Sequence, residues 1–392
     1  MCNHQTPRVV DSIPDTLQSL ISMLTAQRLI IKLGTSTLTG GTTRLSPPRL
    51  VDLVRQMNDI RAQGGEVIVV SSGAMAAGRE RLNFPQLPKD IPAKQMLAAV
   101  GQPRLMALWE QVFGLYGLTI AQVLLTRGDL ADRRRYLNSR NTLLALLAHG
   151  VIPIVNENDT VATEEIRVGD NDNLSALVTN VTDADLLILL TDQAGLYTAD
   201  PRHDPNGQLV TEVTDNEIPE ALWQAAGGSP TGLGTGGMLT KLQAADLARR
   251  SGARVFIARG SEPNVLTRLA AGERLGTYFP PSVTAIESRK RYILAGGRVP
   301  SGSVIVDAGA ARALQNGSSL LPVGVARVEG TFERGDSVRV ADPDGREVAR
   351  GIVNYAAADL ARLRGHRSEE IESVLGYHYG DEVIHRNDMV LM

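Results

Sequence analysis

The sequence predicts an α/β protein, a three-layer αβα sandwich with a mainly parallel sheet, followed by a small β-rich, barrel-like domain. Its 392 residues exceed what one hydrophobic core usually organises, so two domains are expected. Short apolar runs alternate with helix-like patterns as far as residue 277, as in parallel sheets covered by helices. Beyond that point the apolar runs are shorter and punctuated by glycine, which favours a second, β-rich unit.

Five apolar runs predict the strands of the sheet, at residues 29–33, 67–70, 151–155, 186–190 and 254–258. Such runs are typical of strands that are buried on both faces. Each run ends in small or polar residues, and in open α/β sheets ligands bind beyond the carboxyl ends of the strands. We therefore expect a polar site along that edge.

The clearest helix is expected to begin with Ser46 as its N-cap and Pro47 at its first position, and to stop at residues 64–65, which are both glycine. The basic run 133–135 is expected on a helix, as a solvated face or a subunit contact. Similar apolar periodicity predicts further helices at 95–113, 142–148 and 242–250.

Composition shifts divide the chain into an extension at 1–27, an α/β domain at 28–277, a linker at 278–297 and a β-rich domain at 298–392. The linker contains two consecutive prolines and a charged run. Residues 16–24 could form a short amphipathic helix, but we expect the N-terminus to be a loosely ordered extension. Strands of the β-rich domain are expected at 303–306, 324–328, 337–340 and 351–355.

Composition excludes several classes of protein. The net charge of −3 predicts no attraction to nucleic acid or membranes through bulk charge. Cys2 is the only cysteine, which rules out an intramolecular disulfide and fits a reducing cytoplasm. No Cys/His set has metal-ligand spacing, and no apolar run has the length of a membrane span. Residues 1–27 are a poor signal peptide because they contain acids and lack a long apolar core.

Two acidic clusters follow the strand predicted at 151–155. The strand ends in Asn-Glu-Asn-Asp at 156–159, and the chain reaches Gly-Asp-Asn-Asp-Asn at 169–173 before a helix-like segment. Asn and Asp also dominate ordinary turns, so two surface loops are the alternative. We favour a polar site, because turns seldom need so many carboxylates.

Two lysines stand beside glycine-rich turns. Lys32 closes a buried strand and is followed by Gly-Thr-Ser; a buried ammonium needs a partner, and phosphate fits best. Lys241 ends the glycine-rich stretch 232–241, which opens a helix and so forms a ready anion site. That stretch does not have Walker A spacing. The alternative for Lys32 is a lysine at a strand end whose ammonium reaches solvent. The alternative for the stretch 232–241 is a flexible linker.

Two weaker motifs complete the pattern. Residues 190–201, with Thr191 and Asp192 after a strand, suit the edge of a nucleotide site. Ser72 and Gly73 lie in a turn before a helix and could hold a carboxylate through backbone N–H groups. A serine hydrolase is not favoured, because Gly-x-Ser-x-Gly is absent and no His/Asp pair supports one.

Together these motifs indicate phosphoryl transfer, in which lysines neutralise the moving phosphoryl group and carboxylates hold Mg²⁺. Their order closely resembles the glutamate 5-kinases of the amino acid kinase superfamily, from about residue 28 onward. The part beyond residue 298 resembles a PUA domain. The resemblance rests on Lys-Leu-Gly-Thr-Ser, Ser-Ser-Gly-Ala, Asn-Glu-Asn-Asp, Gly-Asp-Asn-Asp-Asn-Leu-Ser-Ala, Leu-Leu-Thr-Asp and Gly-Thr-Gly-Gly-Met-x-Thr-Lys.

The resemblance implies a role for each matching residue. Lys32 and Lys241 would bind ATP phosphates and stabilise the transferring group, and Asp172 would organise these lysines or Mg²⁺. Leu239 departs from the family pattern, and we expect its side chain to point away from phosphate. Glutamate would contact Ser72, Gly73, Asp159 and Asn171. The rest of the ATP site would comprise Thr191, Asp192, Thr235, Gly236, Gly237, Met238, Leu239 and Thr240.

The implied reaction is ATP-dependent phosphorylation of the γ-carboxylate of L-glutamate to L-glutamyl 5-phosphate, the first step of proline biosynthesis. That acceptor is already ionised at neutral pH, so no general base is required. The resemblance also implies Mg²⁺, feedback inhibition by L-proline, a homodimer or homotetramer, and delivery of the labile product to a glutamyl phosphate reductase in the cytoplasm.

Two alternatives are carried forward. One is another superfamily member, such as an acetylglutamate kinase, aspartokinase or uridylate kinase, although those lack this pair of motifs and the tail. The other is an RNA-binding protein, since PUA domains commonly bind RNA. From residue 278 onward 14 basic residues face 15 acidic ones, whereas RNA binding usually shows a basic footprint.

Overall fold

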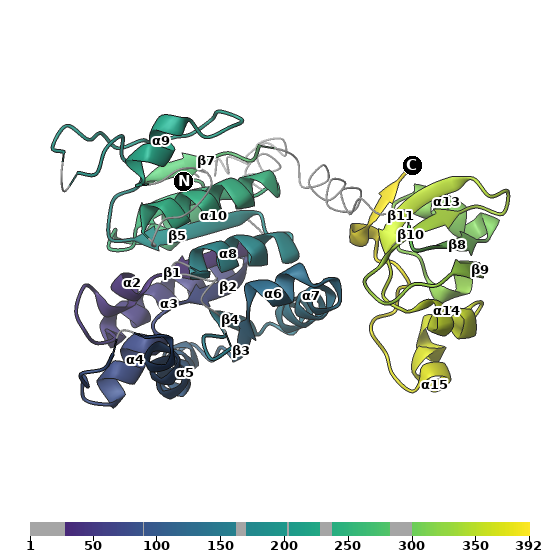
Figure 1. The fold of residues 1–392 in the computed structure, drawn as a ribbon, viewed down its shortest axis with the longest axis horizontal. Coiled ribbons are helices and arrows are strands. Elements are labelled where there is room, and N and C mark those ends of the chain that lie inside the picture. The colour runs from purple at the N-terminus through teal and green to yellow at the C-terminus, as the bar shows by residue number, and fades with distance from the viewer. Residues whose placement is uncertain (1–27, 89, 162–169, 202–203, 228–236, 283–299) are drawn as a thin grey trace, which may run out of the picture.

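The computed structural model describes residues 28–88, 90–161, 170–201, 204–227, 237–282 and 300–392. The N-terminal extension, with the helix considered at 16–24, lies outside these residues, as do Thr235 and Gly236 of the glycine-rich motif. The described residues form two units, an α/β domain and a smaller C-terminal domain (Figure 1).

The α/β domain is built on a sheet that has seven strands in the described residues. All neighbours pair in parallel except β6 and β7, which are antiparallel. The central strand β1 therefore lies between two parallel neighbours, with Lys32 opposite Val70 and Leu189. The order across the sheet is β3 (Ile120–Leu125), β4 (Ile152–Glu157), β2 (Glu66–Ser71), β1 (Arg28–Leu33), β5 (Leu186–Thr191), β6 (Arg254–Arg259) and β7 (Thr277–Phe279).

Helices cover both faces of this sheet, which confirms the predicted three layers. Alternate side chains of β1 enter different cores: Ile30 belongs to one, and Leu29 and Ile31 to the other. The first core packs against α6 (Arg127–Ala131), α7 (Arg133–Ala148), α8 (Asp170–Val181), α9 (Glu220–Ala225) and α10 (Met238–Arg250). The second packs against α2 (Thr35–Thr39), α3 (Pro47–Ala62), α4 (Ala74–Arg81), α5 (Ile91–Gly114) and α11 (Val265–Ala270).

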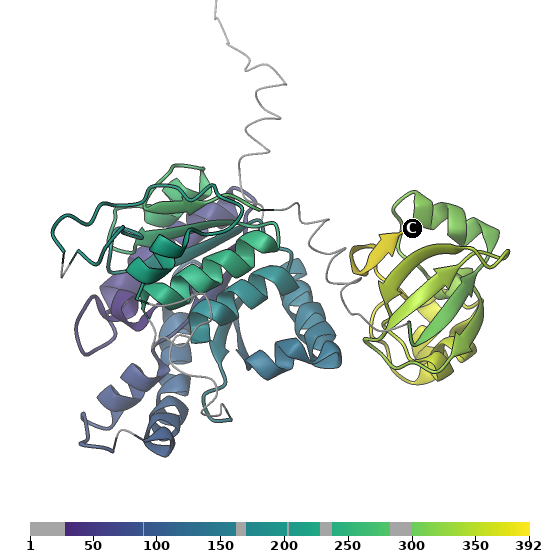
Figure 2. The ribbon, with the colours of Figure 1, turned by 45° about the horizontal axis from the view of Figure 1, so that its top comes forward.

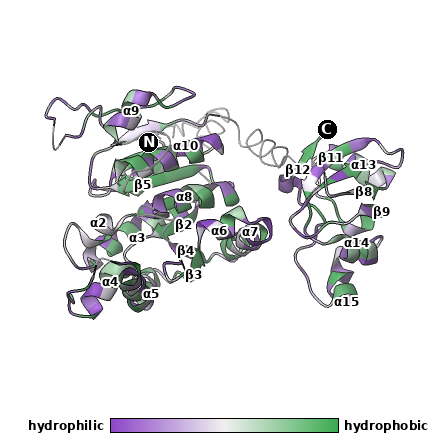
Figure 3. Cartoon of the chain, viewed as in Figure 1, coloured by the Kyte–Doolittle hydropathy of each residue, from purple (hydrophilic) through white to green (hydrophobic). Residues whose placement is uncertain are grey.

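Burial explains why these segments form strands and helices. The residues of β1 and β5 are almost completely buried, and Figure 3 shows hydrophobic residues concentrated along the central strands. On α3 the apolar positions Leu50, Val54 and Met57 recur at helical spacing and are all buried. At about 25 cal/mol per Å² of apolar surface, this burial is the main favourable term in folding.

Helix α3 begins where the sequence predicted, whereas α5, α7 and α10 each begin earlier than predicted, α5 at Ile91 rather than residue 95. Ser46 occupies the N-cap position of α3, but its side chain makes no capping hydrogen bond. Helix α7 begins at Arg133 rather than residue 142, because the Asp132 side chain accepts from Arg135 N and caps it there. Helix α10 begins at Met238, four residues before the predicted start, inside the glycine-rich motif.

The C-terminal domain is a small β-rich unit around its own buried apolar cluster. Its strands form a sheet in the order β12 (Met389–Leu391), β11 (Glu347–Ile352), β10 (Ser337–Ala341), β8 (Gly302–Val306) and β9 (Val325–Gly330). The strand expected at 351–355 thus lies earlier, as β11. Helices α13 (Ala308–Gln315), α14 (Ala357–Leu363) and α15 (Ile371–Leu375) and the 3₁₀ turns η1 (Pro322–Gly324), η2 (Ser368–Glu370) and η3 (Arg386–Asp388) complete it.

The C-terminal domain lies beside the α6–α7 side of the α/β domain in both views (Figures 1 and 2). Strand β7 runs to Phe279, so the sheet continues just past residue 277, and the domain division itself stays a prediction. Across the part of the chain that the structure describes, no helix is both long and apolar enough to cross a membrane.

Candidate active site

The predicted site residues gather at the carboxyl ends of four neighbouring parallel strands. Lys32 lies near the end of β1, Ser72 follows β2, Asp159 follows β4, and Thr191 ends β5. The first turns of α8 and α10 face this edge, since Asp172 and Lys241 reach across to each other and to Lys32. The topology therefore brings together motifs that are about 200 residues apart in the sequence.

Asp172 is the centre of the cluster. Its Oδ1 lies 2.6 Å from Lys32 Nζ, and its Oδ2 lies 3.2 Å from Lys241 Nζ. The Thr240 hydroxyl donates to Oδ2 at 2.7 Å. Asp172 is 2% exposed and Lys32 5%, so two ammonium groups and one carboxylate share a nearly dry site. In the part of the chain that the structure describes, these three groups leave one positive charge in excess, which suits an incoming anion.

Burial and charge oppose each other in setting the protonation of this cluster. Burial alone would raise the pKa of Asp172, but the ammonium groups of Lys32 and Lys241 outweigh it and hold that pKa below the ordinary value. Burial is also the largest influence on Lys32 and lowers its pKa, helped by Lys241 and opposed by Asp172. The carboxylate is therefore ionised at neutral pH.

Lys241, the last residue of the glycine-rich motif, lies in the first turn of α10. Gly237 is the N-cap residue with φ of 100°, a conformation that favours glycine, and its carbonyl lies 3.0 Å from Thr240 Oγ1. Lys241 Nζ also donates to that carbonyl, at 3.4 Å. The first-turn N–H groups of a helix favour anions, so Lys241 and this helix terminus act on the same space.

A second group of polar side chains lies beside the cluster, on the β2 and β4 side. Asn171 Nδ2 donates to Ser72 Oγ at 3.0 Å and to Asn156 Oδ1 at 2.9 Å. Asn171 Oδ1 accepts from the backbone N–H of Glu157 at 3.2 Å. Asn171 and Asp172 are adjacent on α8, so this network and the lysine cluster share one rigid support.

The chain turns sharply where β2 meets α4. Gly73 is the N-cap residue of α4 with φ of 106°, and a Cβ there would lie 3.1 Å from Leu38 Cδ1. This turn points the first N–H groups of α4 toward the strand ends. Asp159 lies in the turn after β4, and burial raises the pKa of its carboxyl group.

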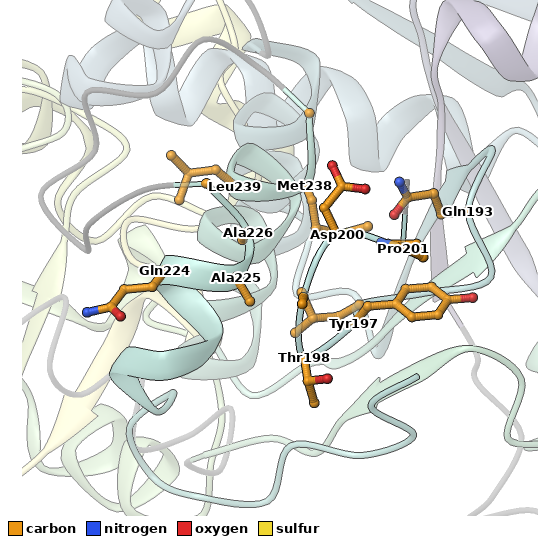
Figure 4. Close-up of a pocket in the computed structure, with 14 residues that line it drawn as sticks. Gln193, Tyr197, Thr198, Asp200, Pro201, Gln224, Ala225, Ala226, Met238 and Leu239 are labelled. Atoms are coloured by element: carbon orange, nitrogen blue, oxygen red, sulfur yellow. The ribbon is translucent and has the colours of Figure 1, made fainter. Parts of the chain in front are cut away.

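Two cavities adjoin the cluster. The smaller has a volume of about 270 Å³ and is lined by residues that include Gly34, Ser36, Thr191, Asp192 and Lys241. It therefore adjoins the lysine cluster, where phosphate is expected to bind. The larger, about 570 Å³, has the size of ordinary small-ligand sites. Figure 4 shows it between two groups of residues. One is the segment with Gln193, Tyr197, Thr198, Asp200 and Pro201, and the other comprises Gln224, Ala225 and Ala226 at the end of α9 and Met238 and Leu239 at the start of α10.

The structure thus brings together Lys32, Asp172, Thr240 and Lys241, and beside them Ser72 and Asn171. Leu239 is buried in the core and also lines the larger cavity. Asn156 and Gln102 were missed as site residues, although Asn156 donates to Gln102 Oε1 at 2.8 Å and supports Asn171. The Asn-Glu-Asn-Asp motif contained a signal for Asn156, whereas nothing in the sequence marks Gln102 in the middle of a helix.

Comparisons with known proteins agree with this geometry. Residues 27–259 match the amino acid kinase family, and residues 302–375 match the PUA domain. The glutamate 5-kinase of Photobacterium profundum is 57% identical over 367 residues, which cover 93% of this chain and 96% of that protein. The glutamate 5-kinase of Herpetosiphon aurantiacus is 56% identical, over 93% of this chain and 98% of that protein. The glutamate 5-kinase of Sodalis glossinidius is 54% identical, over 94% of this chain and 100% of that protein.

The similarity extends along nearly the whole chain, including the C-terminal domain. The family match alone spans more than half of the residues. The chain therefore belongs to the amino acid kinase family and, within it, to the glutamate 5-kinases.

Proposed function

We propose that this chain phosphorylates the γ-carboxylate of L-glutamate with ATP, giving L-glutamyl 5-phosphate, the first step of proline biosynthesis. The observation that carries the proposal is the buried cluster in which Asp172 holds Lys32 and Lys241 at 2.6 and 3.2 Å. Burying two ammonium groups beside a single carboxylate costs free energy unless a bound anion supplies the missing negative charge. The names of the relatives supply the substrate, and the other amino acid kinases are not favoured.

In this proposal the two lysines bind the phosphates of ATP and stabilise the charge that spreads over the transferring phosphoryl group. Asp172 is a positioning residue, which keeps both ammonium groups at one place. Thr191, Asp192 and the residues from Thr235 to Lys241 form the nucleotide site, with the phosphates in the smaller cavity and the nucleoside in the larger one.

The acceptor side is assigned to Ser72, Gly73, Asp159 and Asn171. The Ser72 hydroxyl and the backbone N–H groups of the Gly73 turn can donate to the carboxylates of glutamate. Asn171 Oδ1, which has a second lone pair, and the Asp159 carboxylate can accept from the ammonium group of glutamate. The γ-carboxylate attacks without a general base, because it is already ionised at neutral pH. Catalysis is then positioning and charge stabilisation.

Mg²⁺ is proposed to enter with the nucleotide. In the described part of the chain, no group of three or more His, Cys, Asp and Glu side chains could hold a metal ion. Kinases commonly bind Mg²⁺ through substrate phosphates, waters and one or two carboxylates. Both oxygens of Asp172 already contact ammonium or hydroxyl groups, which favours its lysine-positioning role over direct ligation. When bound, Mg²⁺ would neutralise phosphate charge.

Family membership supports four further proposals. These are inhibition by L-proline, assembly into a homodimer or homotetramer, delivery of the acyl phosphate to a glutamyl phosphate reductase, and action in the cytoplasm. The single cysteine fits the reducing compartment. An acyl phosphate hydrolyses readily in water, so a nearby enzyme that consumes it would protect the product.

The test is ATP turnover by the purified chain with L-glutamate, L-aspartate, N-acetyl-L-glutamate and UMP as separate acceptors. Hydroxylamine in the assay traps an acyl phosphate as its hydroxamate. We expect ADP release and hydroxamate with L-glutamate alone. Equal or faster turnover with another acceptor would reject the assignment.

The RNA-binding alternative is examined in parallel with a gel-shift assay on structured RNA. Binding of RNA by a chain that shows no glutamate-dependent ADP release would move the assignment to that class. Glutamate-dependent turnover with no shift at micromolar protein would reject it.

A further inference from the structure

The C-terminal domain contacts α7 through several specific interactions. Arg134, Asn138 and Asn141 lie on one face of α7 because they are four and three residues apart. The Arg134 guanidinium lies 3.1 Å from the Glu333 carboxylate, and Asn141 Nδ2 donates to Tyr379 O at 3.3 Å. Arg334 donates to Asn138 Oδ1. The basic run predicted as a solvated face or subunit contact therefore meets the other domain of its own chain.

Apolar residues join the two domains as well. Ile352 of β11 and Val390 of β12 belong to the same buried cluster as Leu137 and Leu143 of α7. Both residues are only 4% exposed. The contact is therefore a packed interface and not only a set of exposed ion pairs, each of which contributes little.

Arg140 is the buried charge at this interface. It lies on α7, is 3% exposed, and its Nη2 lies 2.8 Å from Asp183 Oδ2. Its Nε lies 3.7 Å from Oδ1 of Asp388, which belongs to the C-terminal domain. Its Nη1 donates to the backbone carbonyl of Val181. One guanidinium thus makes three contacts, of which one is with the other domain.

Two of those contacts are at the C-terminal end of α8. Val181 is the last residue of that helix, and Asp183 follows with φ of 50°, the left-handed conformation that often ends a helix. The carbonyls there have no partner within the helix, and a cation at this end is favoured by the helix dipole. Arg140 therefore caps α8 at the end opposite Asn171 and Asp172.

We propose that Arg140 is a positioning residue that couples the seating of the C-terminal domain to the orientation of α8, and through α8 to the acceptor and phosphate sites. Helix α8 has 12 residues and is about 18 Å long, so it behaves as a rigid rod over this distance. A displacement at its capped end moves Asn171 and Asp172 at the other end. The nucleoside cavity is lined by other elements, so it would be affected least.

Charge balance makes the coupling depend on both domains. Burial alone would lower the pKa of Arg140, but Asp388 and Asp183 outweigh it and raise that pKa, so the group stays charged. A buried charge that loses a counter-charge is strongly destabilising. Removal of Asp388 would leave Asp183 as the remaining carboxylate on Arg140 in the described residues, so the guanidinium would shift toward water or toward α8.

The test uses the full chain with three variants. Arg140→Met removes the charge and keeps most of the side-chain length, and Asp388→Asn removes only the counter-charge of the C-terminal domain. Glu333→Gln is the matched control, because it breaks the exposed ion pair with Arg134 at the same interface. Calorimetry records whether the two domains unfold in one transition or two. Steady-state kinetics gives kcat and the KM for glutamate and for ATP.

We expect Arg140→Met and Asp388→Asn to split the unfolding into two transitions and to raise the KM for glutamate by about fivefold or more, a usual lower bound for coupled sites. The KM for ATP should rise less than the KM for glutamate, because the nucleoside cavity is lined by other elements even though Asp172 also positions the phosphate-binding lysines. Glu333→Gln should behave as the unchanged chain. If Arg140→Met does not fold, the result for Asp388→Asn alone tests the proposal. Identical results for Asp388→Asn and Glu333→Gln would overturn the proposal. The calorimetric result does not depend on the proposed function.

Discussion

At the scale of single residues, the site buries an uncompensated positive charge, which costs free energy when no ligand is bound. Lys32, Asp172 and Lys241 are all buried, and the carboxylate compensates only one of the two ammonium groups. Such an excess charge is tolerated in a folded protein when it serves a function. Phosphate oxygens supply the missing negative charge, so binding of ATP is expected to stabilise the protein as well as to begin catalysis.

Lys32→Ala and Lys241→Ala should each lower turnover by about 10² to 10³-fold, as expected for loss of one electrostatic stabiliser of the transition state. Each variant leaves Asp172 paired with the other lysine and with Thr240, so the thermal midpoint should fall by only a few degrees. The measurements are kcat and thermal unfolding. Lys94→Ala, at an exposed position of α5, is the control. Near-normal turnover in either folded site variant would reject the assigned roles.

The alkaline limb of activity should report Lys32. Burial is the main cause that lowers its pKa below the ordinary 10.5, and only the protonated form can neutralise phosphate. Activity should therefore be full below that lowered pKa and fall as the pH rises through it, at a lower pH than an ordinary lysine would give. The profile of kcat/KM for ATP reports groups of the free enzyme. A value that stays constant up to pH 10.5 would contradict this reading.

At the scale of elements, α8 and the turn after β4 form the acceptor side. Asn171→Ala removes two donated hydrogen bonds and one accepted bond within the Ser72–Asn156–Glu157 network, and Asp159→Ala removes the half-buried carboxylate. Each should raise the KM for glutamate by about tenfold or more, since a hydrogen bond to a charged group is worth about 1.5–3 kcal/mol. The KM for ATP should change little. An equal loss for both substrates would mean that the loop had collapsed.

Helices α4 and α5 cross so closely that glycine is required at the crossing. A Cβ on Gly101 would lie 1.8 Å from Ala74 O and 2.4 Å from Gly78 N, which are backbone atoms and cannot rotate away. Gly101→Ala should therefore cost about 1–3 kcal/mol or more of unfolding free energy. It should also raise the KM for glutamate, because α4 begins directly after Ser72 and Gly73.

Gly114→Ala on the same helix is the matched control, since a Cβ there would meet nothing within 4 Å. It should be neutral or slightly stabilising in a helix. Denaturant unfolding of both variants compares them directly. Equal midpoints for the two variants would show that the crossing tolerates a side chain.

The elements that sequence alone predicted are those with local signals. The strand runs, the polar strand ends and Lys32 beside its glycine turn could be read because each depends on neighbouring residues. The N-cap at Asp132 was missed because an acid before three arginines reads first as a charge run. The roles of Gln102 beside the site and of Arg140 at the domain interface could not be predicted, because neither lies in a local motif and their partners lie 54 and 41 residues away. Long-range partners leave no periodic trace in a sequence.

At the scale of the whole molecule, the two domains are distinct units that share a packed interface. The composition change near residue 278 predicted the separation, since each domain has its own repeated pattern. It could not predict the docking of the C-terminal domain on α7, which depends on single residues such as Asp388 and Val390. The assigned site residues all lie in the α/β domain, so the coupling proposed above runs from the second domain through α7 and α8.

A chain that ends at residue 290 should fold and keep glutamate-dependent turnover. Every assigned site residue precedes residue 242, and the residues of both α/β cores come from that domain except for Ile352 and Val390. The truncation would expose the part of α7 that packs on Ile352 and Val390, so the thermal midpoint should fall. It would also remove Asp388 from Arg140, so the KM for glutamate should rise as in Asp388→Asn.

The measurements are thermal unfolding, kcat and both KM values, with and without L-proline. A folded truncation without turnover would show that the C-terminal domain completes the site, and an unchanged KM for glutamate would argue against coupling through Arg140. Preserved turnover with altered sensitivity to L-proline would instead make the C-terminal domain a regulatory unit.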